Sequence, residues 1–225
     1  MKKLMLVICL LGVGRLGWAQ SAPPLGSAQS FAVLGGSTVT NTGPTVVTGD
    51  LGVSPGTAVT GFPPGTVSGG TVHAGDAAAT AAQAGAHKAY QDLVAEPCGT
   101  NLTGKTLGTS PGAVTLSPGV YCFNSSAQLT GTLTLSGSGV YVFKIGSTLT
   151  TASKSSVVLA KGATAGNVFW QVTSSATLGT NSAFEGSILA LISDTVTTGA
   201  SVSGRVFALT GSVTLSGNRI HAASK

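Results

Sequence analysis

Hydroxyl side chains recur at alternate positions in four short stretches of this 225-residue chain. The stretches read GSTVTNTG, GSTLTTAS, SATLGTNS and SDTVTTGA, and they begin at Gly36, Gly146, Ser175 and Ser193. In each one a small hydroxyl residue or glycine alternates with an apolar residue. This period of two predicts a β-strand with one buried and one exposed face. Stacked side by side, such strands would form a flat wall of threonine methyl and hydroxyl groups.

The alternation predicts which side chains of the wall face outward. In the first stretch the inward Val39 separates the outward Thr38 and Thr40. We expect the segment around Leu133 to extend the series, whereas Gly179 leaves one outward position open. With two further serines of the same stretches, the outward set is Thr38, Thr40, Ser147, Thr148, Thr150, Ser175, Thr177, Thr195, Thr197, Ser212 and Thr214.

The predicted wall is a rectangular grid. Outward residues of one strand lie about 6.7 Å apart, and stacked strands lie about 4.8 Å apart. Because threonine is β-branched, its side-chain torsion is restricted, and the grid is stiff before anything binds. A rigid, flat, uncharged grid suits a periodic solid better than a flexible molecule. Threonine is also a common strand residue, so an ordinary solvated β-surface is the alternative interpretation.

Charged residues are scarce throughout the chain. They make up 8% of it, whereas about 25% is usual for soluble domains. The 30 threonines outnumber the 17 Lys, Arg, Asp and Glu residues combined, and Asp194 is the one acidic residue next to a predicted outward threonine. No cluster of basic residues with interleaved aromatics is present, so neither nucleic acid nor an anionic membrane is an expected partner.

The first residues have the pattern of a secretory signal peptide. Lys2 and Lys3 precede an apolar run, and small residues Gly17 and Ala19 mark a cleavage site. We expect residues 1–19 to be the signal and residues 20–225 to form one secreted domain. Without residues 1–19 the chain has eight basic and six acidic residues, a small net positive charge.

Two cysteines remain after removal of the predicted signal. In an exported protein Cys98 and Cys122 suggest a disulfide, which would close a 24-residue interval. Two free thiols are the alternative. Neither cysteine belongs to a redox or metal-binding motif, and we expect no metal and no cofactor.

One helix and a series of strands are predicted. Asp76 is a good N-cap, an alanine-rich apolar stripe follows, and Pro97 ends it, so we expect a helix over about 76–95 beside the β-body. Later in the chain, the segment from Thr177 overlays the segment from Thr195 with an offset of 18 residues. A bulky apolar strand leads through a small-residue corner into a Thr/Ser strand in each repeat, which favours a β-solenoid over a two-sheet sandwich.

The residues needed for catalysis are scattered. Polysaccharide hydrolysis or lysis needs paired carboxylates or a Ca²⁺ site, and only Glu185 and Asp194 are placed to share a region. His73 and Asp76 form an HxxD spacing at the helix start, where a surface or hydrogen-bonding role is the more common one. No nucleophile elbow, Walker loop or HExxH motif is present. We therefore expect a protein that is not an enzyme.

Several long segments resemble the microbial ice-binding (antifreeze) protein family. They include FAVLGGSTVTNTGPTVVTGDLGVSPGTAVTGFPPG from Phe31, NVFWQVTSSATLGTNSAFEGSILA from Asn167 and TGASVSGRVFALTGSVTLSGN from Thr198. The resemblance implies an all-β fold: an irregular (discontinuous) β-solenoid of triangular cross-section with one long α-helix packed alongside. It also implies that the N-terminal coil packs against the C-terminal coil.

The resemblance adds residues to the predicted site. It implies that Ser37, Thr38 and Thr40 lie beside Ser212 and Thr214 on one flat ice-binding face. The family's T-A/G-x-T/N pattern is matched at two places, which adds Thr42, Thr45, Thr57 and Thr60.

The function implied is that of a secreted, monomeric protein that adsorbs to an ice crystal surface and inhibits ice growth and recrystallisation. A secreted β-solenoid adhesin or polysaccharide-binding module is the alternative.

Overall fold

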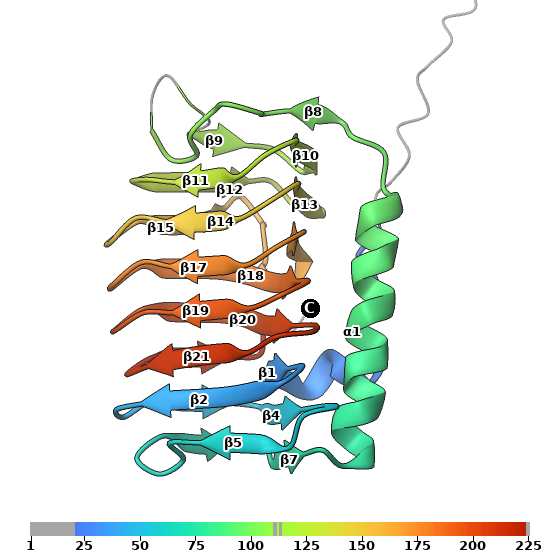
Figure 1. Cartoon of the computed structure of the whole chain (residues 1–225). Helices are drawn as coiled ribbons and strands as arrows, with labels where there is room; N and C mark the ends of the chain where they lie inside the picture. Colours follow the sequence, from blue (N-terminus) through green and yellow to red (C-terminus); the bar gives the residue numbers. More distant parts are fainter. Residues whose placement is uncertain (1–20, 110–111, 113, 224–225) are drawn as a thin grey trace, which may run out of the picture.

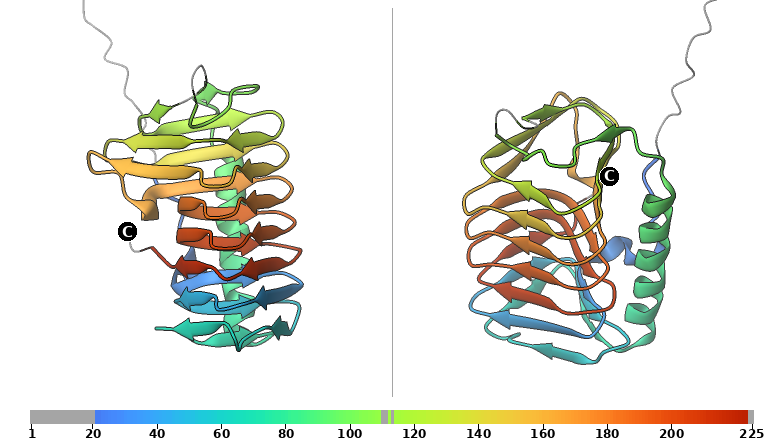
Figure 2. Two further views of the ribbon diagram at one scale, coloured as in Figure 1. Left: turned by 90° about the vertical axis from the view of Figure 1, so that its left-hand side faces the viewer. Right: turned by 45° about the horizontal axis from the view of Figure 1, so that its top comes forward.

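Parallel strands stack into a solenoid of triangular cross-section with one helix along its side, as Figures 1 and 2 show. The computed structural model describes residues 21–109, 112 and 114–223. The predicted signal peptide lies outside these residues. The predicted fold class is confirmed.

One face of the solenoid is a seven-stranded parallel sheet. Its strands are short, and every second side chain is buried. In order along the sheet they are β11 (Ala127–Leu129), β14 (Leu149–Thr151), β17 (Ala176–Leu178), β19 (Asp194–Val196), β21 (Val213–Ser216), β2 (Thr38–Thr42) and β5 (Ala58–Thr60).

The second sheet bends around the two other faces. The bend lies within the long strands β18 (Ala183–Ala190) and β20 (Ser201–Ala208), at Gly186 and Gly204, both of which have positive φ angles. The face next to the helix also contains β7 (Val72–Ala74), β4 (Asp50–Val53), β1 (Phe31–Gly35), β16 (Val168–Val172), β13 (Tyr141–Ile145), β10 (Gly119–Phe123) and β8 (Thr100–Asn101). The third face contains β6 (Thr66–Ser68), β3 (Val46–Thr48), β22 (Arg219–His221), β15 (Ser156–Ala160), β12 (Thr132–Ser136) and β9 (Thr115–Leu116).

The strands stack in the register that the internal repeat predicts. Gly186 pairs with Gly204, and Ala190 pairs with Ala208, both at the offset of 18 residues. In register, like side chains of successive coils lie on one another. Inside the solenoid the rings of Phe143 and Trp170 stack with centroids 3.8 Å apart, and Tyr121 and Phe184 continue the row.

One predicted extension of the series is wrong. The segment around Leu133 forms β12, which pairs with β15 and β9 on the third face. Leu133 is buried, as an inward strand residue should be. The alternation therefore predicted the strand correctly but not its face. To the seven-stranded sheet, that coil contributes the strand β11, which contains Gln128.

The coils do not stack in chain order. The first coils occupy one end of the solenoid, and β1, β2 and β3 pair with the last strands β20, β21 and β22. The helix α1 (Ala77–Ala95) then carries the chain along the body to the opposite end (Figure 1). Nineteen residues make a helix about 28 Å long, which matches about six coil spacings of 4.8 Å. This is the discontinuity that the family resemblance implies.

The helix packs on the body through small side chains. Ala82, Ala86 and Ala89 are fully buried, and the amide of Gln83 donates to the carbonyls of Ala208 and Leu209 at the end of β20. The helix begins at the predicted N-cap, where the Asp76 carboxylate accepts a hydrogen bond from the Ala79 N–H. This bond lowers the pKa of Asp76. No helix in the described residues is both long and apolar enough to cross a membrane.

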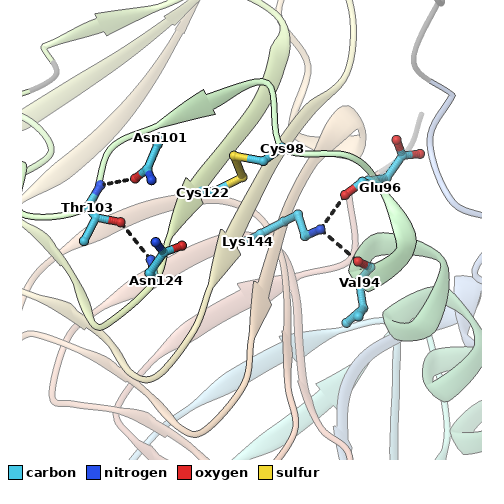
Figure 3. Close-up of a disulfide and its surroundings, with 8 residues drawn as sticks. All are labelled: Val94, Glu96, Cys98, Asn101, Thr103, Cys122, Asn124 and Lys144. Carbon is cyan, nitrogen blue, oxygen red and sulfur yellow. Dashed lines mark hydrogen bonds between the residues drawn. A yellow bond between two sulfur atoms is a disulfide. The ribbon is translucent and has the colours of Figure 1, made fainter.

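The end of the helix is fixed to the first coil that follows it (Figure 3). Cys98, three residues beyond α1, forms a disulfide with Cys122 of β10. The ammonium group of Lys144 donates hydrogen bonds to the carbonyls of Val94 and Glu96, and therefore satisfies carbonyls that the helix end leaves free. Burial lowers the pKa of Lys144.

We predict that the Cys98→Ser, Cys122→Ser double variant is less stable but keeps the fold. Loss of the crosslink frees a 24-residue interval in the unfolded chain, which is worth about 3 kcal/mol on the chain-entropy account. Urea unfolding of the two proteins measures the difference. An unchanged midpoint would show that Lys144 and the strand pairing alone fix the helix end.

Candidate functional site

The outward side of the seven-stranded sheet, here named the threonine face, presents a continuous column of threonines. Six of its seven central residues are threonine, and each pairs in register with the next. From one end the central column is Gln128, Thr150, Thr177, Thr195, Thr214, Thr40 and Thr60.

Two further columns flank the central one, two residues away on either side. The preceding column contains Ser126, Thr148, Ser175, Ser193, Ser212, Thr38 and Ala58, and the following column includes Gly179, Thr197, Ser216 and Thr42. Adjacent strands of the face, here called its ranks, are about 4.8 Å apart, and adjacent columns are about 6.7 Å apart. The face is therefore the rectangular grid that the alternation predicts.

Hydroxyl groups bond along the columns and hold one another in place. Thr148 Oγ1 donates to Ser126 Oγ at 2.8 Å in the preceding column, and Thr40 Oγ1 donates to Thr214 Oγ1 at 3.5 Å in the central one. Ser193 Oγ accepts from the N–H of Ser212. Beneath the grid lie fully buried side chains, among them Val39, Leu149 and Val213. Packing below and hydrogen bonds above both restrict the face to one arrangement.

The face carries no charge. None of the residues in its three columns, all of them described by the structure, is Asp, Glu, Lys or Arg. Asp194, the acidic residue next to Thr195, points inward: it pairs with Ala176 and Val213 in the buried row and is 2% exposed. Neither of its carboxyl oxygens has a hydrogen-bond partner in the described residues. Burial raises its pKa well above the ordinary value, so the neutral acid is favoured.

Ten of the predicted site residues lie in the central or preceding column, and Thr42 and Thr197 lie in the following one. Ser37, Thr57 and Ser147 lie at the corner before the sheet, where the chain turns into β2, β5 and β14. The ten are Thr38, Thr40, Thr60, Thr148, Thr150, Ser175, Thr177, Thr195, Ser212 and Thr214.

Thr45 is not on the surface, so its placement in the site needs correction. It is fully buried, donates to the side-chain oxygen of Asn41, and accepts a hydrogen bond of 3.0 Å from the N–H of Asn218. Asn41 and Asn218 belong to the N-terminal and C-terminal coils that meet here. The threonine of the T-G-x-T match therefore joins two coils inside the solenoid and cannot contact a surface ligand.

The gap at Gly179 has a steric cause. A Cβ at this position would lie 2.5 Å from the carbonyl oxygen of Thr151 and 2.6 Å from the carbonyl carbon of Ala152. No side chain fits without movement of the neighbouring backbone. The N–H of Gly179 instead donates to Thr151 Oγ1 at 2.8 Å. The following column is therefore interrupted at this rank.

Some residues of the face escaped the sequence-based prediction. Ser193 stands two residues before Thr195, and Ser216 two after Thr214, so the same alternation contained both. Ser126 and Gln128 were missed because their coil was assigned through Leu133. Ala127 and Leu129, both buried, flank Gln128 and carry the same signal in a shorter stretch.

The carboxylates considered for catalysis do not share a surface. Asp194 lies inside the solenoid beneath the threonine face, whereas Glu185 lies on β18 before the bend, in register with Ser203 of β20. Burial raises the pKa of Glu185. His73 bonds Asp76 at 2.8 Å and lies 4.0 Å from Asp50, at the helix start. In the described part of the chain, no three His, Cys, Asp or Glu side chains are grouped to hold a metal.

The protein family described as ice-binding-like matches residues 33–221. An ice-binding protein of Nostoc sp. (strain HG1) is 52% identical over 207 residues, which are 90% of this chain and 75% of that protein. An ice-binding protein of Flammulina populicola is 36% identical over 211 residues, which are 84% of this chain and 84% of that protein.

Solved structures agree with these relatives. The crystal structure of an ice-binding protein from an Antarctic biological consortium has a TM-score of 0.85 and 43% identity, and the match covers 91% of this chain and 92% of that one. That of an ice-binding protein from Antarctomyces psychrotrophicus has a TM-score of 0.84 and 37% identity, with 91% and 100% covered.

The position of Asp194 predicts a pH-dependent stability. Because its pKa is raised in the folded state, the unfolded chain releases the proton first, and stability falls as the pH rises above about 4, by up to about 1.4 kcal/mol per pH unit. Asp194→Asn removes this contribution. The variant should therefore gain stability relative to the unmodified protein as the pH rises, which urea unfolding over a pH series measures. Asp92→Asn, at the surface of α1, is the control, and parallel pH profiles for Asp194→Asn and the unmodified protein would contradict the prediction.

Proposed function

Because the chain belongs to the ice-binding-like family, we propose that it binds ice through the threonine face. The observation that carries the proposal is the in-register central column of six threonines on a sheet whose outward columns contain no Asp, Glu, Lys or Arg. The family of the chain supports ice as the ligand, and the geometry supports the threonine face as the binding surface.

The chemistry of the face suits an ice lattice. Threonine methyl groups order the water around them, and the hydroxyl and backbone groups between them hydrogen-bond to that water. A charged side chain would instead hold its own hydration shell and disturb such a layer. Because the grid is rigid before binding, little conformational entropy is lost when it meets the solid. The buried position of Asp194 is consistent with this requirement, since it keeps a carboxyl group out of the face.

We propose further that the protein acts outside the cell, after removal of residues 1–19, as a monomer of residues 20–225. Adsorbed molecules would force ice to grow as curved surfaces between them, and curvature lowers the local freezing point. Inhibition of ice growth and of recrystallisation follow from such adsorption. No residue of the face is assigned a catalytic role.

We predict that Thr195→Tyr abolishes most of the thermal hysteresis. Thr195 lies in the central column with ranks on both sides, and a tyrosine ring there would hold several neighbouring ranks away from ice. Thr132→Tyr is the matched control, because Thr132 is an exposed strand threonine on the third face. Circular dichroism verifies that both variants are folded.

The two variants together separate the face from the rest of the surface. Full hysteresis in a folded Thr195→Tyr would show that the threonine face is not the binding surface. Equal loss in Thr132→Tyr would show that the effect is not specific to this face. Binding of the unmodified protein to a crystalline polysaccharide without any hysteresis would support the alternative function.

Completing the central column should strengthen binding. Gln128→Thr replaces its one residue that is not a threonine, and the larger grid should raise the hysteresis measured at equal protein concentration. Gln128→Ala shortens the side chain without supplying the hydroxyl group and is the control. Equal hysteresis of the two variants would show that β11, the end strand of the sheet, is not part of the ice-binding surface.

A further inference from the structure

A second buried charged residue, on another face than Asp194, lies on the side of the solenoid that the helix covers. Arg205 of β20 is 2% exposed. By strand alternation its side chain points away from the core, since the next residue, Val206, belongs to the core. The Nη2 group donates to the carbonyl of Gln29 at 2.6 Å, in the short helix η1 (Gly26–Ser30) that lies over it. The Nε–H has no partner in the described residues.

A serine hydroxyl without a partner lies beside this guanidinium group. Ser187 of β18 is the in-register partner of Arg205, so the two side chains project from adjacent strands toward the same side. Ser187 is fully buried, and its Oγ has no hydrogen-bond partner in the described residues. The next residue in this row is the apolar Phe169. Two buried polar groups without partners thus project from adjacent strands on the same side of the sheet.

No acidic side chain compensates the charge. Arg205 forms no ion pair with Asp or Glu within the described part of the chain. Glu185, two residues before Ser187, is separated from it by the bend at Gly186 and is in register with Ser203. A buried charge without a counter-charge costs several kcal/mol, on the order of the stability of a domain.

Arg205 and Asp194 differ in how each can be neutralised. Asp194 accepts a proton and becomes neutral. Burial lowers the pKa of Arg205 only to about 10, so the guanidinium group stays charged at neutral pH. Loss of a proton does not remove the charge, and the Gln29 carbonyl accepts from Nη2 alone, so a counter-ion at the unpartnered Nε–H would compensate the charge further.

We propose that the folded protein binds one small monovalent anion, with chloride as the physiological ion, between Arg205 Nε–H and Ser187 Oγ–H. The Arg205 Nε–H can only donate, and the Ser187 hydroxyl can turn its O–H toward the same ligand, which favours an anion over a cation. They lie on adjacent strands, both buried, and η1 lies over Arg205, so a small ion fits this position better than a bulky one. The proposal does not depend on ice binding, but growing ice excludes salt, and the anion concentration in the remaining liquid would therefore rise as freezing proceeds.

Anion-dependent stability tests the proposal. Thermal unfolding of the full mature chain is followed in sodium chloride and in sodium gluconate at equal ionic strength, because gluconate is too bulky for the site. The unfolding midpoint should rise with chloride and level off as the site fills, beyond any shift in gluconate. Coincident curves in the two salts would overturn the proposal.

Variants assign the effect to the site. Arg205→Met should abolish the chloride-specific shift, whereas Arg219→Met, at an exposed arginine of β22, should retain it. Ser187→Ala, which keeps the guanidinium group, should need more chloride for the same shift. This third variant tests the site even where Arg205→Met does not fold. A chloride shift that survives unchanged in Ser187→Ala or in a folded Arg205→Met would contradict the assignment.

A crystal grown in sodium bromide gives a direct reading. The anomalous signal of bromide should appear between Arg205 Nε and Ser187 Oγ. A map without a peak there, at a bromide concentration that saturates the stability shift, would refute the site.

Discussion

In-register stacking of parallel coils is the constraint on which the rest of the structure depends. Because each coil hydrogen-bonds to the next at about 4.8 Å, a residue type repeated in sequence becomes a column in space. Inward columns form the aromatic row through Phe143 and Trp170 and the aliphatic core. Outward columns form the threonine face. Flatness, rigidity and regular spacing are consequences of one backbone pattern. Threonine side chains repeat this pattern at the surface as regularly spaced methyl and hydroxyl groups.

The face is continuous although the chain is not. Its last two ranks, β2 and β5, come from residues before the helix, and β21 from the end of the chain. The junction is held by backbone pairing and by buried polar contacts. Thr45 links Asn41 to Asn218, and Asn218 in turn donates to the carbonyl of Thr197 at the edge of the face. The helix is the connection that makes this chain order possible, and its alanines permit close packing on the coils.

The sequence predicted the features that are local or periodic. Alternation around Val39 and Val196 identified outward threonines, and the 18-residue overlay predicted the pairing of β18 with β20. Alternation could not show on which of the three faces of the solenoid a strand lies, so Leu133 was assigned to the wrong face. Thr45 was misplaced because a corner residue lacks the alternation that determines direction. The inward position of Asp194 follows from alternation, but the sequence identified it only as the acidic neighbour of an outward threonine. The structure shows that it is buried in the row that contains Ala176. Arg205 and Ser187 become neighbours through strand pairing alone.

Partition of the protein between ice and liquid tests the central claim most directly. Ice is grown slowly from a dilute solution of the mature protein, and its concentration is measured in the solid and in the remaining liquid. If the threonine face adsorbs to ice, the protein will be enriched in the solid relative to a non-binding protein of similar size. Exclusion from the ice to the same extent as that reference protein would contradict the account.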